Sequence, residues 1–268
     1  MDEFLLIRYY FFMLGFLFRK TVYDLWDNMF RIVLVNLGFI AAIAVPIFLP
    51  GLFYSSVLVL AVRTIGIICC SAYISAAAFS VKSISDYGSF GFGDFFRNFK
   101  KAWPAGLVIG CMIFVFLSMI LIVIPFYISI DSPVGLLLTS VVFWTLIFGL
   151  LSFQFFLAVC ARLDAKLLKA VKKCILIFFD NPGMTIFSLL HNIVVLIVSA
   201  VLAFLFPGPG GILLFLDEAL RLRLLKYDWL EANPDADRRK IPWDAILIEE
   251  REKTGTRSLK NFIFPWKD

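Results

Sequence analysis

Five ionisable side chains inside apolar stretches of this chain are candidates for a functional site, because a charge there is costly and calls for an explanation. They are Arg63, His191, Asp217, Glu218 and Arg221. Together such groups could line a polar cavity that binds an anion or a sugar, or that relays protons. The alternative is that they neutralise one another and fix the packing of helices. The residue types alone leave both interpretations open.

Spacing along the chain indicates which of these groups could meet. Arg63 follows the start of its apolar stretch by nine residues, or about 13 Å of helix at 1.5 Å per residue. Asp217 and Glu218 follow the Pro-Gly-rich turn at 207–211 at a similar interval, about 10–12 Å. The matching depth permits a buried pair between Arg63 and one of the acids. Asp217 and Arg221 could instead pair with each other, because they are i,i+4 neighbours.

No pattern in the chain is typical of catalysis. The single histidine, His191, has no obvious nucleophile near it in the sequence, and G-x-S-x-G, H-E-x-x-H and G-x-x-x-x-G-K-[ST] motifs are absent. The five cysteines form no C-x-x-C pair and lie in or beside apolar stretches, as small buried hydrophobes do. We therefore predict no enzyme activity, catalytic residue, cofactor or metal site. No motif indicates nucleic-acid binding.

The elements that must position these groups are membrane helices. The chain of 268 residues is 61% hydrophobic, with 31 phenylalanines, and its mean hydropathy is +0.92. Soluble domains are nearer 45–50% apolar. The apolar stretches are continuous and not alternating, which favours helices over a barrel. We expect an all-α polytopic protein with about six spans, at 32–53, 54–81, 105–130, 134–161, 182–206 and, despite its charges, 212–229.

The distribution of basic residues predicts the orientation. Of the 25 Lys and Arg residues, 21 fall in 1–31, 82–104, 162–173 and 230–268, which can all lie on one side of a membrane. Three more, Arg221, Arg223 and Lys226, lie in the segment that leads into the last of these regions, and Arg63 lies apart from all of them. The positive-inside rule then places both termini in the cytoplasm. We expect three parts in a bacterial inner-membrane protein: a cytoplasmic N-terminal region (1–31) with an interfacial helix at 4–18, a helical bundle (32–229) and a cytoplasmic polar tail (230–268).

Two cytoplasmic stretches, 92–103 and 164–178, have an apolar stripe opposite a cationic face. The cations are Arg97, Lys100, Lys101, Lys166, Lys169, Lys172 and Lys173. One interpretation is a helix that lies in the headgroup layer and anchors the span that follows. The other is a surface that binds a cytoplasmic partner or anionic lipid headgroups.

The tail contains two apolar islands among mixed charges. Residues 243–253 could form one short amphipathic helix, and a second island lies at 262–266. Their tryptophans, Trp243 and Trp266, could anchor the tail on the membrane or the bundle. Partner binding is the alternative.

Several short motifs resemble those of the YesL-like family, bacterial membrane proteins of unknown function. The motifs are Asn36-Leu37-Gly38, Pro50-Gly51, the stretch 94–101, Asn181-Pro182 and Phe206-Pro207-Gly208. The resemblance covers about residues 20–229, and the tail and the depth of Arg63 depart from it. Because members of the family often accompany carbohydrate-uptake transporters, it implies an accessory role.

Two functions are therefore expected. The first is a non-enzymatic accessory or regulatory partner of a solute transport system, with sugar as the expected solute, acting through the amphipathic stretches and the tail. Its partners would be the lipid bilayer, anionic headgroups and a permease or other membrane protein. The second is a transporter or channel that uses the five ionisable groups.

Overall fold

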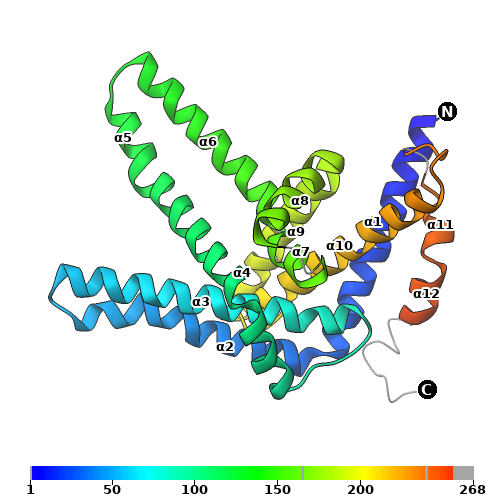
Figure 1. The fold of residues 1–268 in the computed structure, drawn as a ribbon, viewed down its shortest axis with the longest axis horizontal. Coiled ribbons are helices and arrows are strands. Elements are labelled where there is room, and N and C mark those ends of the chain that lie inside the picture. Colours follow the sequence, from blue (N-terminus) through cyan, green and yellow to red (C-terminus); the bar gives the residue numbers. More distant parts are fainter. Residues whose placement is uncertain (1, 164–165, 239–240, 256–268) are drawn as a thin grey trace.

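The computed structural model describes residues 2–163, 166–238 and 241–255, with side chains from residue 12 onward. These ranges are helical and contain no strand, which confirms the all-α class (Figure 1). The elements in chain order are α1 (Asp2–Asp27), α2 (Met29–Phe48), the 3-10 turn η1 (Leu49–Leu52), α3 (Ser56–Ser85), α4 (Phe92–Ser118), the π-helical segment η2 (Met119–Val123), α5 (Ile124–Ser129), α6 (Pro133–Phe153), α7 (Phe156–Leu163), α8 (Leu167–Asp180), α9 (Pro182–Val201), α10 (Gly208–Ala232), α11 (Trp243–Ile246) and α12 (Ile248–Thr254).

Five helical segments of the described chain are long and apolar enough to cross a membrane. They are Met29–Leu52, Ser56–Ser85, Phe92–Ser129, Pro133–Leu163 and Pro182–Val201. The shortest has 20 residues, about the number that crosses a hydrocarbon core of ~30 Å. The chain is therefore a multi-pass membrane protein, and the first five predicted spans are confirmed.

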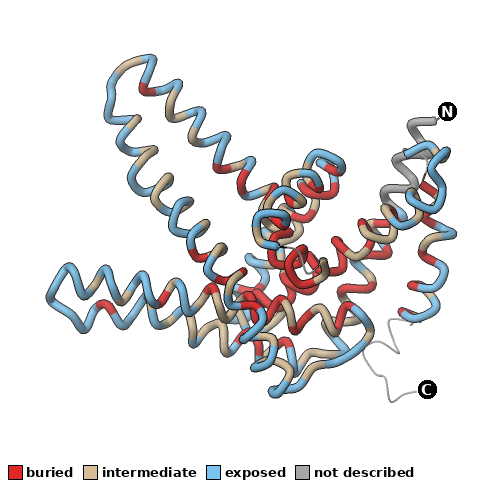
Figure 2. Tube along the Cα trace, viewed as in Figure 1, coloured by how far each residue is buried: buried red, intermediate tan, exposed pale blue. Residues whose placement is uncertain are grey.

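Two long hairpins project from one region of the protein (Figure 1). We call this region, where the hairpins meet α1, α7 and α10, the junction. One hairpin consists of α2 and α3, and the other of α4, η2 and α5 against α6. Their outer parts carry exposed apolar side chains such as Leu52, Leu121 and Leu137. Buried residues gather instead where the hairpins meet α1, α7 and α10 (Figure 2). Exposed apolar surface of this extent requires lipid around the hairpins.

Small residues let α3 and α4 approach closely. A Cβ atom added at Gly106 would lie 2.7 Å from Cα of Ala72, and one at Gly110 would lie 2.9 Å from Oγ of Ser71. Glycines four residues apart on one helix face are a common packing device between membrane helices. This contact joins the two hairpins near the junction.

The amphipathic stretch 92–103 does not form a separate helix. It continues through Pro104 into the third span as the single helix α4. The helix begins with a capping interaction in which Gly91 N donates to Oδ2 of Asp94 at 3.0 Å. The second stretch forms α8, whose buried face contains Ala170, Cys174 and Ile177.

The structure differs most from expectation at 212–229. This segment lies within α10, which is not among the five apolar spans. It is buried among the other helices, with Asp217 and Glu218 both inside the protein. A helix with this many charges is expensive to expose to lipid, and burial against polar partners removes that cost.

The turn that starts α10 is held by one asparagine of α2. The amide of Asn36 donates to the carbonyls of Leu205 at 2.9 Å and Pro207 at 2.8 Å, and its oxygen accepts from Gly210 N at 2.8 Å. Gly208 has a φ of +62°, a left-handed conformation that favours glycine. A side chain there would also meet Asn36.

The N-terminal helix and the tail pack on the junction. Helix α1 is longer than the predicted interfacial helix and buries Met13, Phe16 and Leu17. The prediction of one tail helix at 243–253 is wrong, because the segment is divided at Leu247 into α11 and α12. Trp243 is buried in the core that includes these α1 residues. The island at 262–266, with Trp266, lies outside the described residues.

Candidate functional site

A network of charged and polar side chains occupies the junction. Helix α10 runs through its centre, and α1, the end of α3, α7 and α12 contribute partners. We call it the junction network, and its members are Lys20, Thr21, Asp24, Ser85, Asp86, Tyr87, Arg162, Asp217, Glu218, Arg221, Glu250 and Thr254.

Glu218 faces α1. Its carboxylate accepts a hydrogen bond from the hydroxyl of Thr21 and lies 3.5 Å from Nζ of Lys20. The side chains of Lys20 and Glu218 are 1% and 0% exposed. Lys20 also pairs with Asp24 at 2.5 Å and lies 4.2 Å from the ring centre of Tyr87. A lysine this deeply buried requires such partners, because an unpaired charge there would be prohibitive.

Asp217 faces away from α1, since consecutive residues on a helix are turned by about 100°. Its carboxylate pairs with the guanidinium of Arg162, at the end of α7. Arg162 also lies 3.0 Å from Oδ1 of Asp86 and donates to the hydroxyl of Ser85 at 2.7 Å. One arginine thus links α10 to the end of α3.

Arg221, one turn further along α10, connects the network to the tail. Its guanidinium lies 2.5 Å from Asp86 and 2.7 Å from Glu250 of α12. The hydroxyl of Tyr87 donates to Oε2 of the same Glu250 at 2.8 Å. Burial raises the pKa of Tyr87, and the neighbouring carboxylate of Glu250 raises it further. The phenol therefore remains a donor at neutral pH.

A second, smaller network ties α10 to the start of α9. Asn181 accepts hydrogen bonds from Arg223 at 2.5 Å and from Lys226 at 3.2 Å. Asp180 accepts from the hydroxyl of Tyr227 at 2.8 Å and lies 3.4 Å from Lys226. Burial alone would raise the pKa of Asp180, but Tyr227 and Lys226 outweigh it and hold that pKa below its usual value.

The five predicted ionisable groups are only partly brought together. Asp217, Glu218 and Arg221 lie in the junction network, each with partners other than those expected. Arg63 is exposed in the outer half of α3 and forms no ion pair with any described residue. His191 stacks on Phe215 with a centroid distance of 3.6 Å. The expected pairs of Asp217 with Arg63 or Arg221 are absent from the described residues, because Arg162 takes that position.

Several members of the network were not singled out in the sequence. Lys20, Asp86, Arg162 and Glu250 belong to regions that charge patterning assigns to cytoplasmic segments, where charges are usually solvated. Their burial arises from contacts between distant segments, for example 198 residues apart for Lys20 and Glu218. No local pattern in the sequence reports such contacts.

The predicted cationic surface is largely exposed. Arg97, whose side chain is 77% exposed, pairs with Asp94 at 2.5 Å. The remaining cations of that surface are Lys100, Lys101, Lys166, Lys169 and Lys172, which are exposed, and Lys173, which is half-buried. Beside α4, a polar cavity of about 280 Å³ is lined by Lys82, Asp86, Arg97 and Lys101 among others. The cations of the predicted surface are therefore accessible, apart from Lys173.

Within the described ranges, no group of His, Cys, Asp and Glu is arranged to hold a metal ion. The described cysteines are free thiols, of which Cys160 and Cys174 are buried.

Comparisons of the chain with protein-family models, with curated proteins and with solved structures find no match in any of the three. The resemblance to the YesL-like family stays a prediction.

Proposed function

We propose that this multi-pass protein is a non-enzymatic accessory or regulatory partner of a solute transport system in the bacterial inner membrane. We place both termini in the cytoplasm, because α9 and α10 form a hairpin whose two open ends meet at Asn181 and Arg223. This pair therefore adds no net crossing to the four apolar segments before it. Sugar is the expected solute, on the basis of the resemblance alone. The cytoplasmic surface formed by α8, the start of α4 and the tail would bind the transport protein.

One contrast supports this proposal. Asp217, Glu218 and Arg221 of α10 form ion pairs within the chain. Lys169 and Lys172 of α8 are exposed. Buried, mutually neutralised charges fix helix packing, which suits a scaffold. Exposed cations at a membrane boundary suit binding to a partner or to anionic headgroups.

Co-purification of the tagged full chain from native membranes tests the proposal. We expect a permease or other membrane protein to co-purify. Deletion of 230–268 or the triple change Lys166→Glu, Lys169→Glu and Lys172→Glu should abolish its recovery. Arg63→Ala is the control and should retain the partner, because Arg63 lies away from that surface.

Flux measurements in liposomes test the alternative. If the purified chain alone transported a solute, and Arg63→Ala abolished that transport, the accessory role would be wrong and a transporter would be the better description.

A further inference from the structure

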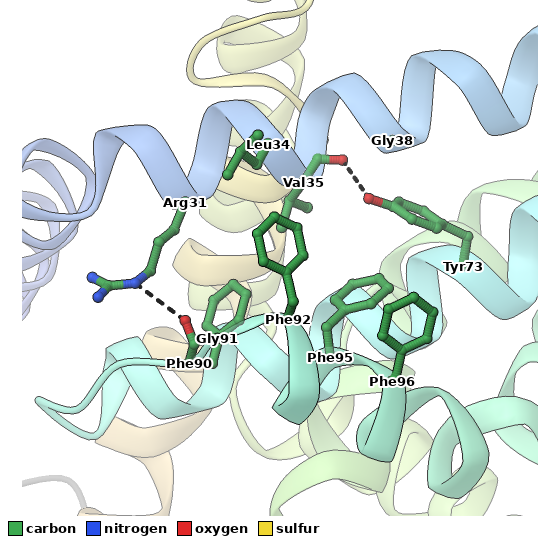
Figure 3. A pocket seen from close by; sticks show the side chains of 10 residues that line it. All are labelled: Arg31, Leu34, Val35, Gly38, Tyr73, Phe90, Gly91, Phe92, Phe95 and Phe96. Atoms are coloured by element: carbon green, nitrogen blue, oxygen red, sulfur yellow. Dashed lines mark hydrogen bonds between the residues drawn. The ribbon is translucent and has the colours of Figure 1, made fainter.

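An apolar cavity of about 470 Å³ opens between α2, α3 and the start of α4 (Figure 3). This volume lies within the range of small-molecule sites, 300–1,000 Å³. The aromatic side chains of Phe92 and Phe95 rise from α4 toward α2, and Tyr73 closes the cavity from α3 (Figure 3). The cavity is separate from the junction network and shares no residue with it.

The walls of the cavity are fixed by packing and hydrogen bonds. The hydroxyl of Tyr73 donates to the carbonyl of Val35 at 2.9 Å, so its polar end is satisfied and its ring faces the cavity edge. The rings of Tyr73 and Phe95 are 5.3 Å apart. Gly38 leaves room for Tyr73, since a Cβ atom there would lie 2.1 Å from the hydroxyl. The cavity is therefore a built feature of the fold.

Arg31 is the only cation among the described residues that line this cavity. Arg31 donates from Nε to the carbonyl of Phe90 at 3.2 Å and from Nη1 to Oδ1 of Asn28 at 2.8 Å. A guanidinium has five N–H donors, so donors remain for a ligand. No described carboxylate pairs with Arg31, so its positive charge is not neutralised within the described part of the chain.

An apolar cavity at the start of a membrane span, beside a guanidinium that no described carboxylate neutralises, matches an anionic phospholipid. We infer that one such lipid binds here, with an acyl chain against Tyr73, Phe92 and Phe95 and its phosphate on Arg31. The apolar lining favours a hydrocarbon chain over a water-soluble anion. The exposed ring of Phe92 at the rim suits the boundary between headgroups and acyl chains. This site does not depend on the proposed transport partner.

Native mass spectrometry of the detergent-solubilised full chain tests the inference, with dioleoyl phosphatidylglycerol and dioleoyl phosphatidylcholine as the two probes. Wild type should retain one phosphatidylglycerol molecule about fivefold more strongly than phosphatidylcholine, since one basic residue near a headgroup contributes about 1 kcal/mol. Arg31→Gln should remove this preference, and Arg31→Lys should keep most of it.

Two further variants separate a site from diffuse attraction. Lys100→Gln removes an exposed cation outside the cavity and should leave the preference unchanged. Leu34→Trp, which adds bulk to the cavity lining, should lower retention of both lipids several-fold. The inference is overturned if Arg31→Gln keeps the preference, if Lys100→Gln lowers it as much, or if Leu34→Trp retains both lipids as wild type does.

Discussion

Arg221 of α10 lies 2.7 Å from Glu250 of α12, which joins the tail to the centre of the bundle. The same carboxylate accepts a hydrogen bond from Tyr87, and Arg221 also pairs with Asp86. The tail is thus attached by side chains that are mostly buried. The position of the tail therefore depends on the ion pairs and hydrogen bonds that the junction network makes with Glu250.

Arg221→Ala should release the tail. The change leaves Glu250 without its cation at a site where the side chain is largely buried, and we expect a loss of about 1–3 kcal/mol in the docking of α12. Hydrogen exchange of 243–255 would report this as faster exchange. Lys253→Ala is the control, since Lys253 pairs with Glu249 within α12 at an exposed site. Equal protection in wild type and Arg221→Ala would show that the ion pair does not hold the tail.

Asn36→Ala should destabilise the turn before α10. It removes three hydrogen bonds to backbone groups around Pro207, and we expect a loss of about 1–3 kcal/mol. The measurement is the unfolding free energy in mixed detergent micelles. Thr64→Ala, which removes one local and exposed hydrogen bond, should have little effect. A similar loss in both variants would contradict a specific role for Asn36.

Gly106→Val should separate α3 from α4. Its side chain would meet the backbone of Ala72, and overpacking of this kind costs about 1–3 kcal/mol. We expect a lower melting temperature in detergent. Gly93→Val is the matched control, because a Cβ atom at Gly93 meets nothing within 4 Å. An unchanged melting temperature for Gly106→Val would show that the close contact is not needed.

Because of Asp180, the free energy of unfolding should depend on pH in the acidic range. Its pKa is lowered in the folded protein from an ordinary value of 3.8, with hydrogen bonds from Tyr227 and Lys226 among the causes. A carboxyl group whose pKa is lower in the folded protein stabilises the fold at pH values above its pKa in the unfolded chain. This contribution disappears as the pH falls through the pKa that the group has in the folded protein. Asp180→Asn should therefore be less stable than wild type at pH 6, and the difference should shrink below pH 4. A difference that is constant from pH 6 to pH 3 would contradict this assignment.

The spans could be predicted because their signals are local. Pro133 and Pro182 start helices α6 and α9 where expected, since proline is favoured in the first turn of a helix. Long apolar stretches report membrane helices without knowledge of the tertiary structure. The helical conformation of 243–253 also follows from local periodicity, whereas the break at Leu247 does not.

The partners of α10 could not be predicted in the same way. The predicted membrane depth of Asp217 and Glu218 assumes that the turn at 207–211 lies at the outer membrane face. The structure instead places it beside Asn36, near the start of α2. Asp217 and Glu218 therefore lie near Ser85 and Lys20, at the opposite end of α3 from Arg63. Only tertiary contacts reveal this arrangement.

A double-mutant cycle on Arg162 and Asp217 tests the central claim, that the acids of α10 are neutralised by cations of the junction. The changes are Arg162→Ala and Asp217→Asn, singly and together, with unfolding free energies measured in mixed micelles. We expect each single variant to lose about 3 kcal/mol, because one partner is left buried and unpaired, and a coupling energy above about 1 kcal/mol. The same cycle with Arg63→Ala should give a coupling near zero. Coupling of Asp217 to Arg63 but not to Arg162 would contradict this account.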